Sequence, residues 1–326
     1  MILDHSVVNQ IHRKIIQADR ILIISHRRPD ADTIGANLSL RKALLSMGKE
    51  VISACRDEIG IENYFLPDVY VYRQNFGKPE DYDLIITVDC GDSKITEYHK
   101  DYEDLFSGKY PIINIDHHVS NDYFGDINLV RADFASTTEI LYMLLRHFKV
   151  KIDSDMATLL LAGLYYDTGS FKHDNTTVRV LEIAAKLTGL GAKASYIAKN
   201  MFRKIPVPTL KVWGKVFERI QINDDKIVSS MVTTEEIKER GGNEDDIKGA
   251  DLISYINSIP EARFSMLLTE KHGVVKGSFR TSRNDTDVAK IAKKYFQGGG
   301  HKKAAGFSVP GKLYINDNRR MIIKEN

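Results

Sequence analysis

The chain has 326 residues, with 46 Lys and Arg against 44 Asp and Glu, and only two cysteines. The near balance of charge excludes a protein that coats nucleic acid with a strongly basic surface. Two distant cysteines exclude a disulfide framework and a structural zinc site built on Cys-x-x-Cys. No stretch approaches the roughly 18–20 apolar residues of a membrane span, and residues 1–20 lack the apolar centre of a signal peptide. We therefore expect a cytoplasmic protein without a membrane partner, and the length predicts two domains.

Short apolar runs alternate with helical patterns in the first half of the chain. The runs at 21–25, 84–88 and 112–115 are almost continuously apolar, as buried strands of a parallel sheet are. Helices are expected at 33–47, at 136–148 after the capping box Ser-Thr-Thr-Glu, and at 155–166. This alternation predicts an α/β fold with a parallel sheet, which binds ligands beyond the carboxyl ends of its strands.

Acidic and imidazole side chains follow each of these strands and the helix at 155–166. They are His26, Asp30 and Asp32, then Asp89 and Asp92, then Asp116, His117 and His118, and finally Asp167. Taken singly, Asp30, Asp32 or Asp92 could be only the N-cap of the next helix. Together, unpaired carboxylates at one edge of a sheet would repel one another, and cations would remove that cost.

The ligand types narrow the choice of cation. Asp30, Asp32, Asp89 and Asp167 bring about four negative charges, which match two divalent ions of a two-metal hydrolase. Mixed carboxylate and imidazole ligation without sulfur favours Mn²⁺, with Mg²⁺ and Co²⁺ among the alternatives. Asp116, directly before His117, is a candidate acceptor for the second ring nitrogen of that histidine.

The second half has a different pattern, after a linker expected at 199–212 where Pro206 and Pro208 interrupt any helix. Strands are expected at 217–222, 226–233, 263–269 and 274–281, and helices at 247–259 and 287–296. The domains predicted from these patterns are residues 1–198 and 213–326. The second is a smaller α/β domain.

Two features of the second half are typical of a site that binds an anion. Gly298, Gly299 and Gly300 precede His301, and glycines let backbone amides approach a phosphate closely, although the same run could be only a flexible helix end. Arg280 can grip a phosphate with two parallel hydrogen bonds, whereas Arg283 has Asp285 and Asp287 close by and suits a surface salt bridge.

The motifs HRRPDADTIGA, VDCGD, IDHHVSN and YYDTGSF, followed by VKGSFRTS and GGGHKKAAGF, resemble the DHH phosphoesterases and their DHH-associated (DHHA) domain. This resemblance covers nearly the whole chain. It implies that His26, Asp30, Asp32, Asp89, His117 and Asp167 bind two metals, with Asp89 and Asp167 shared, and that His118 faces the substrate phosphate. It also implies a substrate-binding role for His118, Arg280, Gly298, Gly299, Gly300 and His301.

The expected reaction is metal-assisted hydrolysis of a phosphoester, with Asp32, Asp89 and His118 as the catalytic residues. In size, the chain is similar to the enzymes of this family that cut RNAs of two to five nucleotides, including pApA, to nucleoside monophosphates. Those enzymes can also dephosphorylate 3′-phosphoadenosine 5′-phosphate. The alternatives are a pyrophosphatase or polyphosphatase with the same metal motifs, and a non-catalytic nucleotide or RNA sensor. The sequence does not decide whether the protein forms a homodimer.

Overall fold

The computed structural model describes residues 3–201, 206–243, 249–316 and 319–323. The chain divides into two compact units, Met1–Arg203 and Lys204–Asn326. The predicted linker at 199–212 overlaps the end of one helix and the first half of the next, which begins at Val207 with Pro206 as its N-cap. Proline suits the start of a helix because its missing N–H group has no intrahelical partner there. Pro206 and Pro208 therefore start a helix instead of preventing one.

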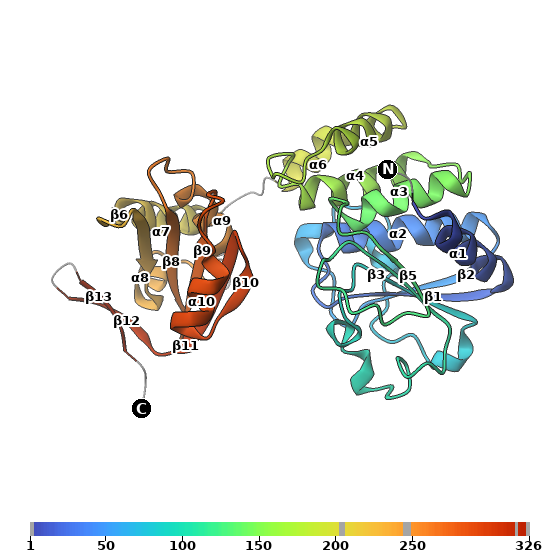
Figure 1. Ribbon diagram of the computed structural model, residues 1–326, viewed down its shortest axis with the longest axis horizontal. Helices are drawn as coiled ribbons and strands as arrows, with labels where there is room; N and C mark the ends of the chain where they lie inside the picture. Colours follow the sequence, from blue (N-terminus) through green and yellow to red (C-terminus); the bar gives the residue numbers. More distant parts are fainter. Residues whose placement is uncertain (1–2, 202–205, 244–248, 317–318, 324–326) are drawn as a thin grey trace. The chain divides into compact units, whose positions relative to one another are not determined.

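The first unit is built on a five-stranded parallel sheet in the order β2-β1-β3-β4-β5 (Figure 1). Three of its strands were predicted. The edge strands β2 and β5 were not, because they are short and less continuously apolar. The strands are β1 (Arg20–Ser25), β2 (Glu50–Ala54), β3 (Leu84–Val88), β4 (Ile112–Asp116) and β5 (Ile127–Val130).

Both faces of this sheet are covered, as its continuous apolar strands predicted. Helices lie on one face and irregular segments on the other (Figure 1). Phe76, Tyr82, Tyr98 and Tyr110 cover the second face, where they pack on residues of β1, β3 and β4. The helices are α1 (His5–Gln17), α2 (Ala31–Ser46), α3 (Thr137–His147), α4 (Ser154–Asp167), α5 (Val178–Gly189) and α6 (Ala194–Met201).

The order in which strands are added to this parallel sheet reverses at β1, since β2 lies on one side of it and β3 on the other. Sheets of this kind bind ligands at the carboxyl ends of the strands where the order reverses, here β1 and β3. The helices α2 and α4 pack closely against each other, and a Cβ atom on Gly35 would lie 2.4 Å from the carbonyl oxygen of Leu159. This close approach brings the N-terminus of α2 and the C-terminal half of α4 to the same region.

The second unit contains a six-stranded mixed sheet in the order β10-β11-β9-β8-β7-β6. Its strands are β6 (Gln221–Ile222), β7 (Ile227–Val232), β8 (Phe264–Lys271), β9 (Val274–Arg280), β10 (Gly299–His301) and β11 (Ala304–Pro310), followed by a separate hairpin of β12 (Lys312–Asn316) and β13 (Arg319–Ile323). The helices are α7 (Val207–Glu218), α8 (Thr234–Glu239), α9 (Gly249–Ile256) and α10 (Val288–Phe296).

Two expectations for this unit need correction. Residues 217–222 are mostly not a strand, because α7 continues to Glu218 and only Gln221–Ile222 pair with β7. Residues 298–301 are not a flexible helix end, because Gly299–His301 pair with β11 in an antiparallel ladder. The part of 247–259 that precedes Gly249 lies outside the described residues. Both domains thus have the α/β architecture that was expected.

Candidate functional site

The first motif places His26 at the end of β1 and Asp30 at the N-cap of α2. The Asp30 carboxylate accepts hydrogen bonds from the backbone N–H groups of Asp32, at 2.9 Å, and Thr33, at 3.1 Å. The capping interpretation is therefore right for Asp30. The same carboxylate also lies within ligand distance of His26 and Asp89, so capping and metal binding are compatible.

Asp32 is fully buried and is held by the start of another helix. The backbone N–H groups of Thr137 and Thr138 donate to its carboxylate at 2.7 and 3.0 Å, and the Thr138 hydroxyl donates at 2.6 Å. Free N–H groups at a helix N-terminus stabilise a negative charge. Gly163 of α4 lines the same place, where a Cβ atom would lie 2.5 Å from Asp32 Oδ1. The first turn of α3 and the absence of a side chain at Gly163 together position this carboxylate.

Asp89 follows β3 in a left-handed backbone conformation, with φ of 60°. Its side chain is buried, and it accepts hydrogen bonds from the hydroxyl groups of Thr33, at 2.6 Å, and Thr137, at 2.9 Å. A non-glycine residue with positive φ costs free energy, and such residues are concentrated at functional sites. The backbone strain and the two threonines fix Asp89 between α2 and α3.

The two adjacent histidines after β4 have different partners. His117 Nε2 lies 3.2 Å from Asp167 Oδ2 and 3.7 Å from Asp89 Oδ1. His118 Nδ1 lies 2.8 Å from Asp116 Oδ1. The expectation that Asp116 orients His117 is wrong, because alternating side chains of an extended segment point to opposite sides and residue 118 shares the side of residue 116.

Among the residues that the structure describes, three groups of side chains have ligand atoms that all lie within 4.8 Å of one another. They are His26, Asp30 and Asp89; Asp32, His117 and Asp167; and Asp89, His117 and His118. The first two groups contain the six residues that were predicted to bind metal, and the third connects them through Asp89 and His117. Asp92 belongs to none of them and is the N-cap of the 3-10 helix η4 (Ser93–Thr96).

The electrostatics of these residues fit bound cations. Burial, followed by the nearby charges of other carboxylates, raises the pKa of Asp32 and of Asp167 well above the usual range. Burial also acts to raise the pKa of Asp89, but the hydrogen bond and charge of His26 outweigh it and lower that pKa. Buried carboxylates that repel one another are stabilised by divalent ions, and the oxygen and nitrogen donors suit hard or intermediate metals. The residues present therefore fit two divalent cations.

Three of the residues of the second unit that were predicted to bind substrate, Arg280, Gly299 and His301, lie on one face of its sheet. Arg280 pairs with Ala304 and Ala304 pairs with His301, so these three residues form one row across β9, β11 and β10. Directly opposite residues on neighbouring strands project to the same face. Gly299 and Gly306 form the next row on that face. We call this surface, formed by Arg280, Gly299, His301, Ala304 and Gly306, the open shelf.

The three glycines have different roles. A Cβ atom on Gly298 would lie 2.2 Å from the carbonyl oxygen of Gly306, and one on Gly300, which has φ of 139°, would lie 2.5 Å from that of Ala304. Close strand packing therefore requires both. A Cβ atom on Gly299 would meet no atom within 4 Å. Of the three, only Gly299 leaves open space on the shelf.

Arg280 carries a half-buried charge. Its guanidinium donates to the carbonyl oxygen of Phe279 at 3.0 Å, and burial lowers its pKa. In the described part of the chain no carboxylate forms an ion pair with it. Arg283, in contrast, pairs with Asp285 at 2.9 Å, as expected. A desolvated cation without a carboxylate partner is suited to an anionic ligand.

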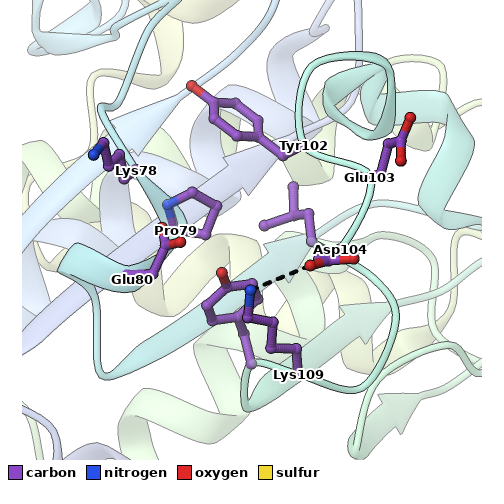
Figure 2. Close-up of a pocket in the computed structure, with 9 residues that line it drawn as sticks. Lys78, Pro79, Glu80, Tyr102, Glu103, Asp104 and Lys109 are labelled. Carbon is purple, nitrogen blue, oxygen red and sulfur yellow. Dashed lines mark hydrogen bonds and ion pairs between the residues drawn. The ribbon is translucent and has the colours of Figure 1, made fainter.

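A pocket of about 330 Å³ lies at the opposite edge of the first sheet (Figure 2). Its lining comes from residues 78–80, which precede β3, and from residues 102–105, 109 and 110, which precede β4. Lys109 points to Asp104 across it at 3.2 Å. The predicted ligands lie at the carboxyl ends of the same strands, so this pocket is separate from the metal site.

Residues 20–164 match the DHH family, N-terminal domain, and residues 224–325 match the DHHA1 domain. The chain belongs to the DHH/DHHA1 phosphoesterase family and is a metal-dependent phosphoesterase. Among the described residues, no helix is long and apolar enough to cross a membrane.

Two of the curated relatives that the chain matches share one name. The bifunctional oligoribonuclease and PAP phosphatase NrnA of Thermus thermophilus is 29% identical over 295 residues, which cover 89% of this chain and 84% of the relative. The protein of the same name from Bacillus subtilis is 23% identical over 309 residues, covering 92% of each. The crystal structure of an exopolyphosphatase-related protein from Bacteroides fragilis has a TM-score of 0.84 at 23% identity, covering 94% of this chain and 91% of that protein. This last likeness shows that the fold is shared.

Sequence reasoning missed the residues that hold the ligands. Thr33, Thr137 and Thr138 donate to Asp32 or Asp89, and Gly163 leaves room for Asp32. The run Ser-Thr-Thr-Glu was interpreted only as a capping box, and Ser136 does accept from the N–H of Glu139 at 3.0 Å. Glu139, however, accepts from the N–H of Ala135 instead of that of Ser136. The two central threonines of this run were therefore the part of the sequence that indicated support for the metal ligands.

Proposed function

We propose that this phosphoesterase hydrolyses short oligoribonucleotides of two to five nucleotides, including pApA, to nucleoside monophosphates. Under the same proposal, the enzyme also converts 3′-phosphoadenosine 5′-phosphate to AMP. The observation that carries it is the open shelf of the second unit, where Arg280 and His301 share one face and no carboxylate in the described residues pairs with Arg280. A nucleotide phosphate would supply the missing negative charge. The names of the two NrnA relatives support the same substrate class.

In the first unit, the six predicted ligands would hold two divalent ions, with Mn²⁺ as the first metal to test. When bound, such ions supply a water of lowered pKa and neutralise charge on phosphoryl oxygens. His118 is half-exposed, and its Nδ1 is fixed by Asp116. The opposite ring nitrogen is then directed away from Asp116 and can donate a hydrogen bond to a phosphoryl oxygen. Asn121, which donates to Asp116 at 2.6 Å, keeps that carboxylate in place.

The test is product analysis by chromatography after incubation of the full chain with Mn²⁺. The substrates are pApA, a five-nucleotide RNA, a long RNA, 3′-phosphoadenosine 5′-phosphate and pyrophosphate. We expect AMP from pApA and from the bisphosphate, nucleoside monophosphates from the five-nucleotide RNA, and little product from the long RNA. The variants Asp89→Ala and His118→Ala should lose these activities, because the first removes a metal ligand and the second a phosphate donor.

Two outcomes would overturn the proposal. Release of phosphate from pyrophosphate without cleavage of any nucleotide would indicate a phosphoanhydride hydrolase. Binding of pApA without turnover at any tested metal concentration would indicate a nucleotide sensor.

A further inference from the structure

We infer that a loop beside the first motif, residues 60–66, forms with Arg28 a subsite for one nucleotide of the substrate. In this subsite the phosphate contacts Arg28 and the base lies on Tyr64. The inference rests on the proposed function, because it concerns a nucleotide at the same metal site. It adds a base-binding surface that the sequence did not reveal.

The loop is anchored directly to the first motif. The side-chain amide of Asn63 donates to the carbonyl oxygen of Pro29 at 3.4 Å, and Pro29 lies between Arg28 and the predicted ligand Asp30. The 3-10 helix η1 (Ile61–Asn63) and the buried side chain of Leu66 hold the loop in shape. The segment is therefore anchored next to the first motif.

Two large side chains of this loop are turned to solvent. Ile61 is 82% exposed and Tyr64 is 61% exposed, whereas the neighbouring Phe65 packs against Tyr196 with ring centroids 6.0 Å apart. Single exposed apolar side chains are common on proteins, but a pair on an anchored loop beside a catalytic motif indicates a binding surface. Aromatic side chains accept a stacked base of any identity, because every base has a π-face.

The two adjacent arginines of the first motif have different surroundings. Arg27 is neutralised by Asp57, at 3.1 Å, and by Glu97, at 2.6 Å. Arg28 is exposed, and among the described residues its guanidinium has no hydrogen-bond or ion-pair partner. Its backbone has a left-handed conformation, with φ of 50°, and its N–H group donates to Asp57 at 3.1 Å. A strained backbone that presents an unpaired guanidinium is explained by an anionic ligand.

The position of Arg28 also fits this role. It lies two residues from His26 and two residues from Asp30, and two residues span at most about 7 Å. A phosphate at the metal site is thus within reach of a long Arg side chain, and the attached nucleoside would extend towards Tyr64. A pyrophosphate could use Arg28 but has no group for Tyr64 or Ile61. The combined surface therefore favours a nucleotide over an inorganic phosphate chain.

The experiment compares steady-state hydrolysis of pApA with that of an analogue that lacks one base, using the full chain with Mn²⁺. Tyr64→Ala should raise KM for pApA by about 5- to 150-fold, the range that corresponds to loss of one base–aromatic stack, with kcat nearly unchanged. Tyr64→Phe should behave as the wild type, because the ring carries the interaction. With the analogue that lacks the stacked base, the wild type and Tyr64→Ala should have the same KM.

Tyr70→Ala is the matched control, because Tyr70 belongs to the same connection after β2, is 83% exposed and donates its hydroxyl to Asp68. Its KM should equal that of the wild type. Arg28→Ala should raise KM for both substrates, because both carry the phosphate, and Arg28→Lys should restore part of the loss.

The inference is overturned if the wild type cleaves pApA and Tyr64→Ala has the same KM, or if Tyr64→Ala changes KM equally for both substrates. Failure of the wild type to cleave any oligonucleotide is a different result. It overturns the proposed function, and the inference falls with it.

Discussion

The metal site of the first unit and the open shelf of the second hold their charges in different ways. Asp32 and Asp89 are buried and are held by hydrogen bonds from three threonines. Within the ranges that the structure describes, the Arg280 guanidinium donates to a backbone carbonyl and to no carboxylate, and His301 is exposed. The first arrangement is rigid before any ligand binds, as a reacting centre requires. The second leaves its donors free, which suits capture of a substrate group. Mutations should therefore affect turnover at the metal site and KM at the shelf.

The largest effect is expected at Asp89. Asp89→Asn removes a negative charge from two of the three groups of ligands, so metal content and activity should both fall. The loss should exceed the 10- to 100-fold typical of a residue that only supports a ligand, and we expect about 10³-fold or more. Bound metal measured by mass spectrometry and the initial rate on pApA would check this.

Asp92→Asn is the control for that variant. Asp92 lies three residues further along the same motif, but it caps η4 and belongs to no ligand group. Metal content and activity should remain near those of the wild type. Equal losses in the two variants would contradict the assignment of Asp89.

A smaller effect is expected at Gly163, which lies against Asp32 and Thr138. In Gly163→Ala the new methyl group would lie 2.5 Å from Asp32 Oδ1 and from the Thr138 side chain. Either Asp32 or the start of α3 must move, so metal affinity should fall by about 10- to 100-fold. Overpacking should also lower the free energy of unfolding by about 1–3 kcal/mol. Metal titration followed by activity, together with urea unfolding, would measure both.

Gly189→Ala is the matched control, because Gly189 is also helical and a Cβ atom there would meet no atom within 4 Å. It should leave metal affinity unchanged. A Gly163→Ala protein that binds metal as the wild type does would show that Asp32 is not held where the structure has it.

These variants also show what the sequence could and could not predict. His26, Asp30, Asp89 and His117 follow strands of one parallel sheet, so their convergence follows from the fold class alone. Thr138 and Gly163 could not be predicted, because they meet Asp32 only where α2, α3 and α4 pack together. Periodicity identifies a buried face of a helix but not which helix covers it.

The shared face of the open shelf could not be predicted, for a related reason. In a ladder, the register decides which residues share a face, and a sequence does not give the register. The residue types of Arg280 and His301 predicted a phosphate site, and the pairing of both residues with Ala304 explains why they share a face. The base-binding surface at Tyr64 could not be foreseen, because exposure of one tyrosine among 15 is a property of the fold.

Arg280→Ala tests the shelf. Loss of a charge-assisted contact to a phosphate should raise KM for pApA by about 10-fold, corresponding to roughly 1.5 kcal/mol, while metal content stays unchanged. Lys276→Ala is the control, because Lys276 lies on the same face of β9 but four residues away, opposite Ser308. It should change KM little. A lower kcat with an unchanged KM in Arg280→Ala would contradict a role in substrate capture.

The smallest effect concerns the metal-free protein and its dependence on pH. Burial acts to lower the pKa of His26, but the hydrogen bond and charge of Asp89 raise it to about 9. The hydrogen bond to Asp116 raises the pKa of His118 to about 9. Both values exceed 6.5, the ordinary pKa of an unfolded histidine. Their stabilising contribution is therefore complete below pH 6.5 and is lost as the pH rises through 9.

Thermal unfolding in EDTA should accordingly give a lower Tm at pH 9 than at pH 6.5. Bound Mn²⁺ needs neutral imidazoles and ionised carboxylates, so metal binding releases protons and stabilises the folded state more as the pH rises. The difference in Tm between Mn²⁺ and EDTA should widen across this interval. His118→Asn, which removes one of the two histidines, should reduce the pH dependence in EDTA. If Tm in EDTA does not change between pH 6.5 and 9, the metal-free site does not hold charged histidines against Asp89 and Asp116.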